Sequence, residues 1–468
     1  MENHPIDEET PLLLDAQKKK ITAKSTPLPK LQIYILMILQ LCEPIAYFSI
    51  YPYINRLVSE LDITGGDIRK VGYYAGLIES LYYATEAVTV LQWSRASDHL
   101  GRKPILLFGL AGTALSMLCF GLSRTFWGLV ISRCICGMLN GNVGVMKSAL
   151  GELTDSSNRA EGFALLPMVW SLGSTLGPLM GGSLARPHER FPRVFSGEFW
   201  KEYPYFLPCA VSAGCVFVSF MVALLCFQET LTKRPVRRYS SDTITPDQMD
   251  QPLPLRQLLV FPVLISVSNY VSLAFLDMML FSLVPLFMTM PPEIGGMGTS
   301  QVVIGYALGV QGAINGVVQV AFFAKVIRRF GERRIFLISM GTFPCMFALF
   351  PIMSMISKNN GPRWIVWTLL ATILLLMIVM ITGYGCVFMY VTASAPNRRS
   401  LGATNGLSQT TVSIFRAIGP ALATSMFSFS VEKDLLGGYA VYLVLFVCSC
   451  LAIPLAMLLP EQVWEEKN

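Results

Sequence analysis

The chain has 468 residues, of which 53% are hydrophobic and only 14% are charged, and its formal net charge is +6. Soluble globular proteins carry about a quarter charged residues, so this composition excludes an ordinary soluble fold and indicates a chain that lies largely in lipid. The first 30 residues are polar and charged, which predicts no cleavable signal peptide. We therefore expect the first apolar stretch to direct membrane insertion.

Twelve apolar stretches are long enough to cross a bilayer core of about 30 Å, which takes roughly 20 helical residues. We expect these spans at residues 31–54, 72–93, 104–123, 126–148, 161–184, 204–227, 257–288, 302–324, 334–356, 364–391, 401–429 and 438–459. The sequence thus predicts an all-α integral membrane protein with twelve transmembrane helices.

Lys and Arg are unevenly divided between the two sides of these spans. With the N-terminus in the cytoplasm, the inner segments carry 22 of them and the outer segments 11, and Arg133, Lys147 and Arg416 lie within spans. The outer loop at 185–203 holds four of the eleven and weakens the asymmetry. Because basic residues accumulate in cytoplasmic loops, we expect both termini to be cytoplasmic.

A polar stretch divides the chain into six spans and six. Residues 229–256 hold a Lys/Arg cluster followed by a Ser/Thr/Asp/Pro run, which predicts a flexible cytoplasmic linker between bundles at 31–228 and 257–459. We expect residues 1–30 to form a disordered cytoplasmic tail and residues 460–468 a second tail.

The two halves repeat weakly in sequence. Gly177-Pro178 corresponds to Gly419-Pro420 at an offset of 242 residues, and Gly101 with its following bases corresponds to Gly331. Repeated six-span halves are typical of carriers whose binding site lies between them. The repeat therefore predicts two pseudo-symmetric six-helix halves.

Three motifs resemble those of the major facilitator superfamily across nearly the whole chain. The loop after the second span carries Asp98, Gly101, Arg102 and Lys103 in the family's pattern, although Ser94 and His99 depart from it. The fourth span carries Arg133-x-x-x-Gly137. The fifth resembles the signature of drug:proton antiporters, with the residues Gly173, Gly177, Pro178, Gly181 and Gly182.

Finer features are similar to the zinc-induced-facilitator-like group of fungi and plants. They are Glu43-Pro44, Trp93 and the segment Asn405-Gly406 to Gly419-Pro420. The Cys motif and His-rich loop of the plant members are absent, and only three histidines occur, so the resemblance does not imply a metal cargo. The eleven cysteines are scattered through apolar stretches and predict neither a disulfide framework nor a metal site. We expect no cofactor.

Ionisable residues inside spans are the candidate site, because such groups are costly in lipid and commonly functional. At about 1.5 Å per residue, Glu43, Glu79, Arg133 and Arg416 all lie roughly 18–22 Å from the inner end, near the midplane. We expect Glu43 to exchange a proton for cargo, with Arg133 favouring its charged form. A purely structural ion pair between the two residues, and no contact between them, are the alternatives.

Three further positions belong to the candidate cavity. Glu79 and Glu86 are seven residues apart and project from one helical face. Glu86 is nearer the inner end, where a solvated vestibule is an alternative to a cargo role. Asp277 is the only acid in the seventh span and lies closer to the outer face, where it could pair with Arg416. For Arg416 itself, anion binding and helix locking are both open.

The inner loop and the glycine positions are predicted to control shape rather than bind cargo. Asp98 is expected to accept hydrogen bonds at a helix start, with Arg102 and Lys103 at the inner interface and Gly101 between them. Gly173, Gly177, Gly181 and Gly182 form a small-residue stripe for close helix packing or a hinge. Pro178, and Gly419 with Pro420, permit kinks.

We interpret the sequence as a secondary transporter that moves small organic solutes by alternating access, as a proton-coupled antiporter. A symporter or facilitator for a nutrient, and a membrane receptor or scaffold, are the alternatives. We expect no enzyme activity, no nucleic-acid partner and a monomer in the bilayer. The residues Glu8, Leu12 and Leu13 resemble an acidic dileucine signal for a sorting adaptor and favour a vacuolar over the plasma membrane.

Overall fold

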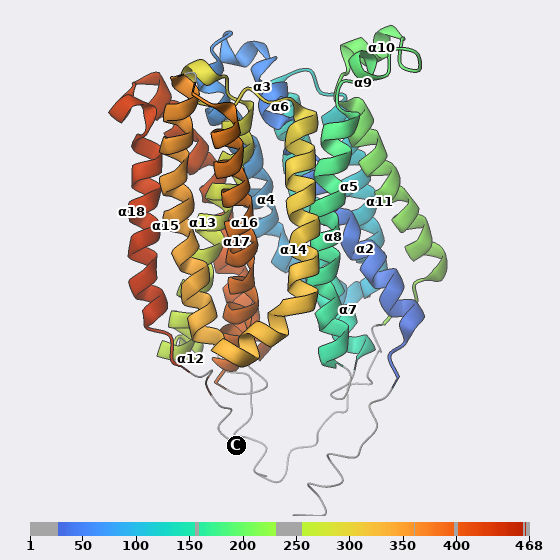
Figure 1. The fold of residues 1–468 in the computed structure, drawn as a ribbon. Coiled ribbons are helices and arrows are strands. Elements are labelled where there is room, and N and C mark those ends of the chain that lie inside the picture. The colour runs from blue at the N-terminus through green and yellow to red at the C-terminus, as the bar shows by residue number, and fades with distance from the viewer. Residues whose placement is uncertain are drawn as a thin grey trace, which may run out of the picture.

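The computed structural model describes residues 27–154, 159–230, 255–359, 361–396, 401–461 and 464. All regular structure in these ranges is helical, as predicted (Figure 1). The first 26 residues, including the sorting motif at Glu8, Leu12 and Leu13, lie outside the described residues, as does most of the predicted linker at 229–256.

The long helices stand side by side. In the N-terminal half they are α2 (Lys30–Phe48), α4 (Val71–Leu100), α5 (Arg102–Gly121), α6 (Phe126–Leu139), α7 (Asn142–Leu153), α8 (Arg159–Leu184) and α11 (Phe206–Cys226). In the C-terminal half they are α13 (Phe261–Thr289), α14 (Gln301–Phe330), α15 (Glu332–Lys358), α16 (Arg363–Ala393), α17 (Leu401–Glu432) and α18 (Ala440–Met457). Short helices α3 (Ile54–Ser59), α9 (Pro187–Arg190), α10 (Glu198–Glu202) and α12 (Leu255–Leu258) lie at the ends of the bundle.

Ten of the predicted spans match helices that are long and apolar enough to cross a membrane, within the residues that the structure describes. The helices α4 and α8 occupy the predicted spans 72–93 and 161–184 but are not among these ten. The multi-pass membrane architecture is therefore supported, while the count of twelve spans stays a prediction.

One predicted boundary is wrong, and one predicted span is interrupted. The span expected at 31–54 is helical only to Phe48, after which the chain turns and begins α3 at Ile54. The span expected at 126–148 is broken between α6 and α7, where Asn140 has non-helical angles (φ −81°, ψ 67°). Asn-Gly is a turn dipeptide, so the sequence itself supplies a reason for the break at Asn140-Gly141.

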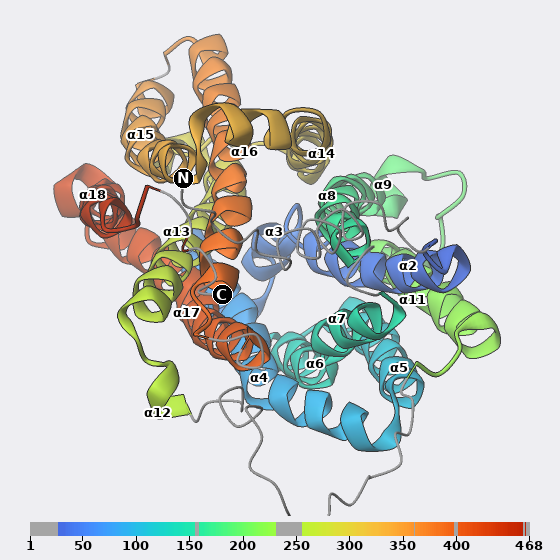
Figure 2. The same ribbon diagram turned by 90° about the horizontal axis from the view of Figure 1, so that it is seen from below.

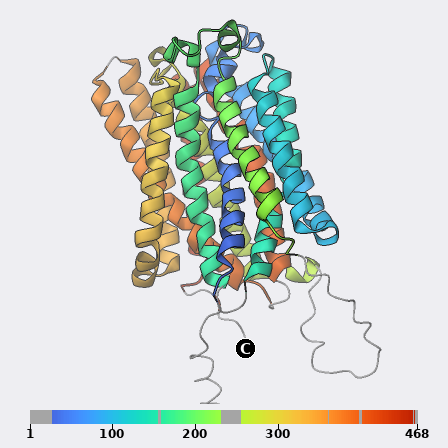
Figure 3. The ribbon, with the colours of Figure 1, turned by 90° about the vertical axis from the view of Figure 1, so that its right-hand side faces the viewer.

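The two halves lie side by side when the molecule is viewed along the helices (Figure 2). We call the end of the bundle at which α2 begins and α18 ends the inner end, and the opposite end the outer end (Figure 1). Across the boundary between the halves, α8 packs along α14 and α4 packs along α17. Within the N-terminal half, α2 lies between α8 and α11 (Figure 3).

The hydrogen bonds described between the halves lie at mid-depth or toward the outer end. At the outer end, the Tyr73 hydroxyl donates to Glu432 at 3.3 Å and Arg190 donates to the Tyr306 hydroxyl at 3.4 Å. Closer to mid-depth, the Ala421 N–H donates to the Ser80 hydroxyl at 2.9 Å. The halves are therefore joined on their outer side.

Candidate functional site

The break in the fourth predicted span places Asn140 among the acids of the site. Its amide nitrogen lies 3.1 Å from Glu43 Oε1, 3.1 Å from Glu86 Oε1 and 2.7 Å from the Tyr82 hydroxyl. An amide group has two N–H donors, so three acceptors converge on a group that can fully satisfy two. Asn140 therefore brings Glu43 of α2 and Glu86 of α4 to one point.

Glu43 and Arg133 line the same small cavity but are not directly paired. The cavity has a volume of about 20 Å³, room for about one water molecule. The described residues show no direct ion pair between the two side chains, and the Arg133 guanidinium lies over the Tyr82 ring at 4.4 Å. Glu43 Oε2 and Arg133 Nε, both buried, have no hydrogen-bond partner.

Glu79 occupies a different place from Glu86, although both project from α4. It is buried, with 6% of its surface exposed, and accepts a hydrogen bond of 2.7 Å from Ser282 of α13. Because α13 belongs to the other half, this bond joins the halves near mid-depth. Glu79 is therefore part of their shared interface.

Asp277 and Arg416 lie in the C-terminal half of the site. Asp277 accepts a hydrogen bond of 2.7 Å from Tyr384, and the described residues show no direct ion pair between Asp277 and Arg416. Arg416 is close enough to interact electrostatically with Asp277, and also with Glu43 and Glu86 across the boundary. Arg416 thus faces the acids of both halves.

Sequence reasoning placed Lys147 within a span without assigning it a role. Its side chain is exposed although it lies on α7 at membrane depth, and it interacts electrostatically with Glu43 and Arg416. A lysine that is both exposed and close to these residues lies on a solvent-accessible surface between the halves. The candidate site therefore contains four acids and three bases, namely Glu43, Glu79, Glu86, Asp277, Arg133, Lys147 and Arg416.

Aromatic rings surround the charged groups on the side of α2. Tyr47 packs against Tyr51 with ring centres 5.2 Å apart and against Tyr83 at 5.6 Å. Phe48 contacts Trp170 at 5.8 Å and Phe281 of the other half at 5.2 Å. Trp170 is 40% exposed. We call these residues, Tyr47, Phe48, Tyr51, Tyr83 and Trp170, the aromatic wall; it combines apolar rings with the tyrosine hydroxyl groups.

The predicted inner loop is a short turn between α4 and α5. Gly101 has a φ of 108°, and the side chain of Arg102 pairs with Glu152 of α7 at 2.9 Å. The Glu229 carboxylate accepts hydrogen bonds from the backbone N–H groups of Arg102 and Lys103, at 2.8 and 3.1 Å. A carboxylate at a helix start is favoured by the helix dipole, and Glu229 holds that position at the start of α5.

Asp98 lies in the last turn of α4, and its side chain is outside what the structure describes. Its predicted hydrogen bonds to a helix start therefore stay a prediction. Sequence reasoning missed Glu229 and Glu152, because both lie far along the chain from the loop that they contact.

The glycine stripe of α8 packs mainly within its own half. A Cβ atom on Gly173 would overlap Pro44 of α2, and one on Gly177 would lie within 3.0 Å of Ile45 and Phe48 of α2. A Cβ atom on Gly181 would overlap Ser49, the residue just after α2. Gly182 and Pro178 instead face α14, where a Cβ atom on Gly305 would lie 2.9 Å from Gly182 Cα. The packing interpretation of the stripe is thus visible in the geometry, and a hinge role stays a prediction.

Gly419 and Pro420 lie in α17. A Cβ atom on Gly419 would lie 3.3 Å from Met278 Cβ, so Gly419 allows α17 to approach α13 closely. The Pro420 carbonyl accepts a hydrogen bond of 2.7 Å from Thr424. Pro420 also lies at the α4–α17 contact, where a Cβ atom on Gly76 would lie 2.8 Å from the Pro420 carbonyl oxygen.

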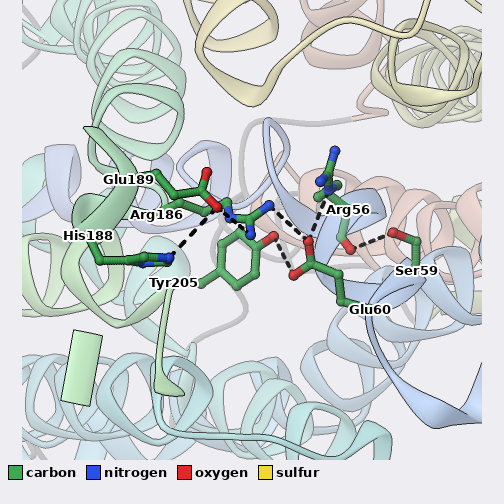
Figure 4. Close-up of polar contacts among 7 residues, drawn as sticks. All are labelled: Arg56, Ser59, Glu60, Arg186, His188, Glu189 and Tyr205. Carbon is green, nitrogen blue, oxygen red and sulfur yellow. Dashed lines mark hydrogen bonds and ion pairs between the residues drawn. The ribbon is translucent and has the colours of Figure 1, made fainter. Parts of the chain in front are cut away.

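A second polar cluster lies at the outer end of the N-terminal half, and sequence reasoning did not single it out (Figure 4). Glu60 accepts hydrogen bonds from Arg56 at 2.9 Å, Arg186 at 3.3 Å and Tyr205 at 3.0 Å. Burial raises the pKa of Tyr205, and the Glu60 charge adds to this, so the phenol stays protonated and donates. The cluster joins the segments after α2 and α8 to the start of α11.

No group of three His, Cys, Asp or Glu side chains with metal-binding geometry occurs in the part of the chain that the structure describes.

Comparison with known proteins agrees with the motifs. The family model described as Major Facilitator Superfamily matches residues 36–420. The chain is 28% identical to the major facilitator superfamily multidrug transporter mfsB of Aspergillus fumigatus, over 88% of this chain and 80% of that protein. It is 26% identical to Protein ZINC INDUCED FACILITATOR-LIKE 1 of Arabidopsis thaliana, over 91% of each. Both predicted resemblances are confirmed.

A solved structure shares the fold. The crystal structure of a bacterial homologue of the human lysosomal transporter Spinster, inward-facing and unoccupied, matches with a TM-score of 0.65 at 16% identity, covering 93% of this chain and 97% of that one. This likeness shows the architecture alone, and the family match covers most of the chain. The chain therefore belongs to the major facilitator superfamily of membrane transporters.

Proposed function

We propose that this chain is a proton-coupled antiporter that moves small organic solutes by alternating access. The observation that carries the proposal is the convergence of Glu43 and Glu86 on the Asn140 amide at mid-depth. Two carboxyl groups that share one neutral donor do not neutralise each other, so a proton on one of them relieves their repulsion.

Three bases beside these acids support exchange of the proton for cargo. Lys147 and Arg416 interact electrostatically with Glu43. When one acid takes a proton, it loses its negative charge, which had balanced the positive charge of the bases. The interactions of these bases with cargo therefore change. Proton and cargo thereby compete for one electrostatic environment, as antiport requires.

The aromatic wall supports organic cargo. The Trp170 ring is 40% exposed and packs against Phe48, which is buried next to Tyr47. Sites for small organic molecules are mostly apolar with a few placed polar groups. The similarity to a multidrug transporter and the Gly-Pro signature of α8 favour export of such molecules over nutrient uptake.

The test is coupled flux in proteoliposomes that contain the full chain and a pH-sensitive dye. The cargo probes are ethidium, a planar aromatic cation, and salicylate, an aromatic anion, together with any metabolite retained differently by vesicles with and without the protein. A cargo gradient is expected to drive protons in the opposite direction, and Glu43→Gln is expected to abolish that proton flux. Protons that move with the cargo would establish symport instead.

Cargo flux without proton movement would establish a facilitator. Unchanged uptake in Glu43→Gln and Arg133→Ala, with partner binding intact, would favour a receptor or scaffold.

We further propose that the inner end is cytoplasmic and that the halves at 31–228 and 257–459 move about the linker at 229–256. A protease site inserted into that linker is expected to be cut only from the cytoplasmic side. A vacuolar location predicts that Leu12→Ala with Leu13→Ala sends a fluorescently tagged chain to the plasma membrane.

A further inference from the structure

Besides the bond from Asn140 to the Tyr82 hydroxyl, two hydrogen bonds join the break between α6 and α7 to α4. Asn140 donates to Glu86, and the indole N–H of Trp93 donates to the Met138 carbonyl at 2.6 Å. Glu86 and Trp93 are seven residues apart, so they lie on one face of α4. The two bonds therefore act across the same interface, one at the acid pair and one nearer the inner end.

The Trp93 bond satisfies a backbone group that the break leaves without its helical partner. In an uninterrupted helix the Met138 carbonyl would accept from the N–H of residue 142. Here the backbone forms shorter-range bonds instead, from Asn140 N–H to Gly137 and from Gly141 N–H to Leu139. Because unpaired carbonyls are costly at membrane depth, the indole N–H stabilises the broken geometry.

The packing around Trp93 is specific to the break. A Cβ atom on the buried Gly141 would overlap the Trp93 side chain, whereas a Cβ atom on Gly144, one turn further along, would meet nothing within 4 Å. On its other side the Trp93 ring packs against Phe108 of α5 at 5.3 Å. Trp93 is thus held between α5 and the break.

We propose that Trp93 is a positioning residue that holds the break in the fourth span, and through it the Asn140 amide, in place against Glu43 and Glu86. The proposal rests on the proposed function, since it assumes that these acids exchange protons. Trp93 also lies two helical turns before Gly101, so a movement of the inner loop would reach Asn140 through this contact.

The proton equilibrium that Trp93 would influence belongs to a group of residues on five elements. The titratable and charged side chains that face the acid pair are Glu43 of α2, Tyr82, Tyr83 and Glu86 of α4, Arg133 and Cys136 of α6, Lys147 of α7, and Arg416 of α17. None of them contacts Trp93 directly among the described interactions, so Trp93 acts on them only through the break.

The first test removes the indole N–H and keeps a ring. Trp93→Phe is expected to raise amide hydrogen exchange at residues 138–143 at least fivefold in nanodiscs. It is also expected to shift the pH of half-maximal flux by at least half a unit, measured with ethidium or salicylate, whichever the wild type moves. The matched control is Trp127→Phe at the outer end of α6, where the ring is 64% exposed. Trp127→Phe should change the hydrogen-exchange rate less than twofold and the pH of half-maximal flux by less than 0.2 units.

The second test displaces Trp93 without changing it. Gly141→Ala is expected to reproduce both effects of Trp93→Phe, because the added methyl group occupies the place of the indole. Gly144→Ala makes the same chemical change in open space and should behave as the wild type.

The outcomes separate this proposal from the proposed function. Wild-type proton flux together with an unshifted pH profile in Trp93→Phe and Gly141→Ala overturns the positioning role alone, even if hydrogen exchange rises, because Trp93 would then be merely structural. Cargo flux without proton flux in the wild type overturns the proposed function and this proposal together. The positioning role is supported if Trp93→Phe and Gly141→Ala both shift the pH profile and raise hydrogen exchange, while Trp127→Phe and Gly144→Ala do neither.

Discussion

Asn140 holds two acids of the site through one amide group, so its replacement should damage transport more than folding. Asn140→Ala removes the donor shared by Glu43 and Glu86, and hydrogen bonds to charged groups contribute about 1.5–3 kcal/mol. We expect coupled flux in proteoliposomes to fall about 10- to 100-fold, since each 1.4 kcal/mol corresponds to a factor of ten.

The control for this change is Asn359→Ala, an exposed residue just after α15. Its flux should equal that of the wild type. Equal flux in Asn140→Ala would contradict a functional role for the shared amide, and a loss explained entirely by a lower thermal unfolding temperature would make the role structural.

At this scale the sequence predicted the charged residues but not their partners. Glu79, Arg133 and Asp277 were recognisable because ionisable groups in apolar stretches are rare and costly. Tyr82 and Tyr384 were recognisable only as possible cavity-lining residues and Ser282 not at all, because helix rotation and tilt decide which neutral side chain meets which charged group. The signal for Asn140 was present in the Asn-Gly dipeptide within an apolar stretch.

At the scale of elements, α5 depends on a carboxylate from beyond α11. Glu229 accepts from the first two backbone N–H groups of α5, and its side chain is exposed. We expect Glu229→Ala to lower stability by about 0.5–1 kcal/mol, measured by thermal unfolding in detergent. Glu229→Gln keeps an acceptor and should lose less.

The matched control is Glu293→Ala, which removes an exposed acid from the η4 turn (Pro292–Ile294) at the outer end. A stability loss of the same size there would show that the measured effect is not capping of α5.

The contact between α8 and α14 should set the balance between outer-closed and outer-open states. Gly305→Ala would place a methyl group against Pro178 and Gly182, and overpacking costs about 1–3 kcal/mol. This cost falls only on the outer-closed state, in which the two helices touch. We therefore expect the population of the outer-open state to increase. Spin labels on Val194→Cys and Lys433→Cys should report a larger population at long distance.

Gly341→Ala in α15 is the control, since a Cβ atom there meets nothing within 4 Å. An unchanged distance distribution in Gly305→Ala would contradict this prediction. It would mean that the α8–α14 contact does not set the population of the outer-closed state.

Helix existence was easier to predict than helix continuity. Apolar length located α13 and α16, because a bilayer imposes that length. It did not locate the end of α2 at Phe48 or the break after α6, since tyrosine, proline and asparagine inside an apolar stretch barely change its hydropathy. The directions in which glycine stripes face likewise depend on packing against α2 and α14 rather than on spacing alone.

At the scale of the whole molecule, the weak internal repeat predicted two related halves with a site between them. Which end of the molecule is closed does not follow from the sequence, because alternating access requires one sequence to support both arrangements. In this structure the halves meet toward the outer end, through contacts such as Tyr73 with Glu432. These contacts belong to one state, and the alternating access that we propose requires that they break.

Linking the halves across that contact should therefore stop transport. We expect a short bifunctional thiol reagent to abolish flux in Tyr73→Cys with Glu432→Cys, and removal of a cleavable linker by a reducing agent to restore it, in a background where the reagent does not affect native cysteines. The control is Arg124→Cys with Glu202→Cys, which replaces an ion pair at the same end but within the N-terminal half. Linking a pair inside one half leaves the halves free to separate, so flux should persist. Full flux in the linked Tyr73–Glu432 pair would contradict outer opening, whereas loss of flux in both pairs would point to rearrangement within the N-terminal half.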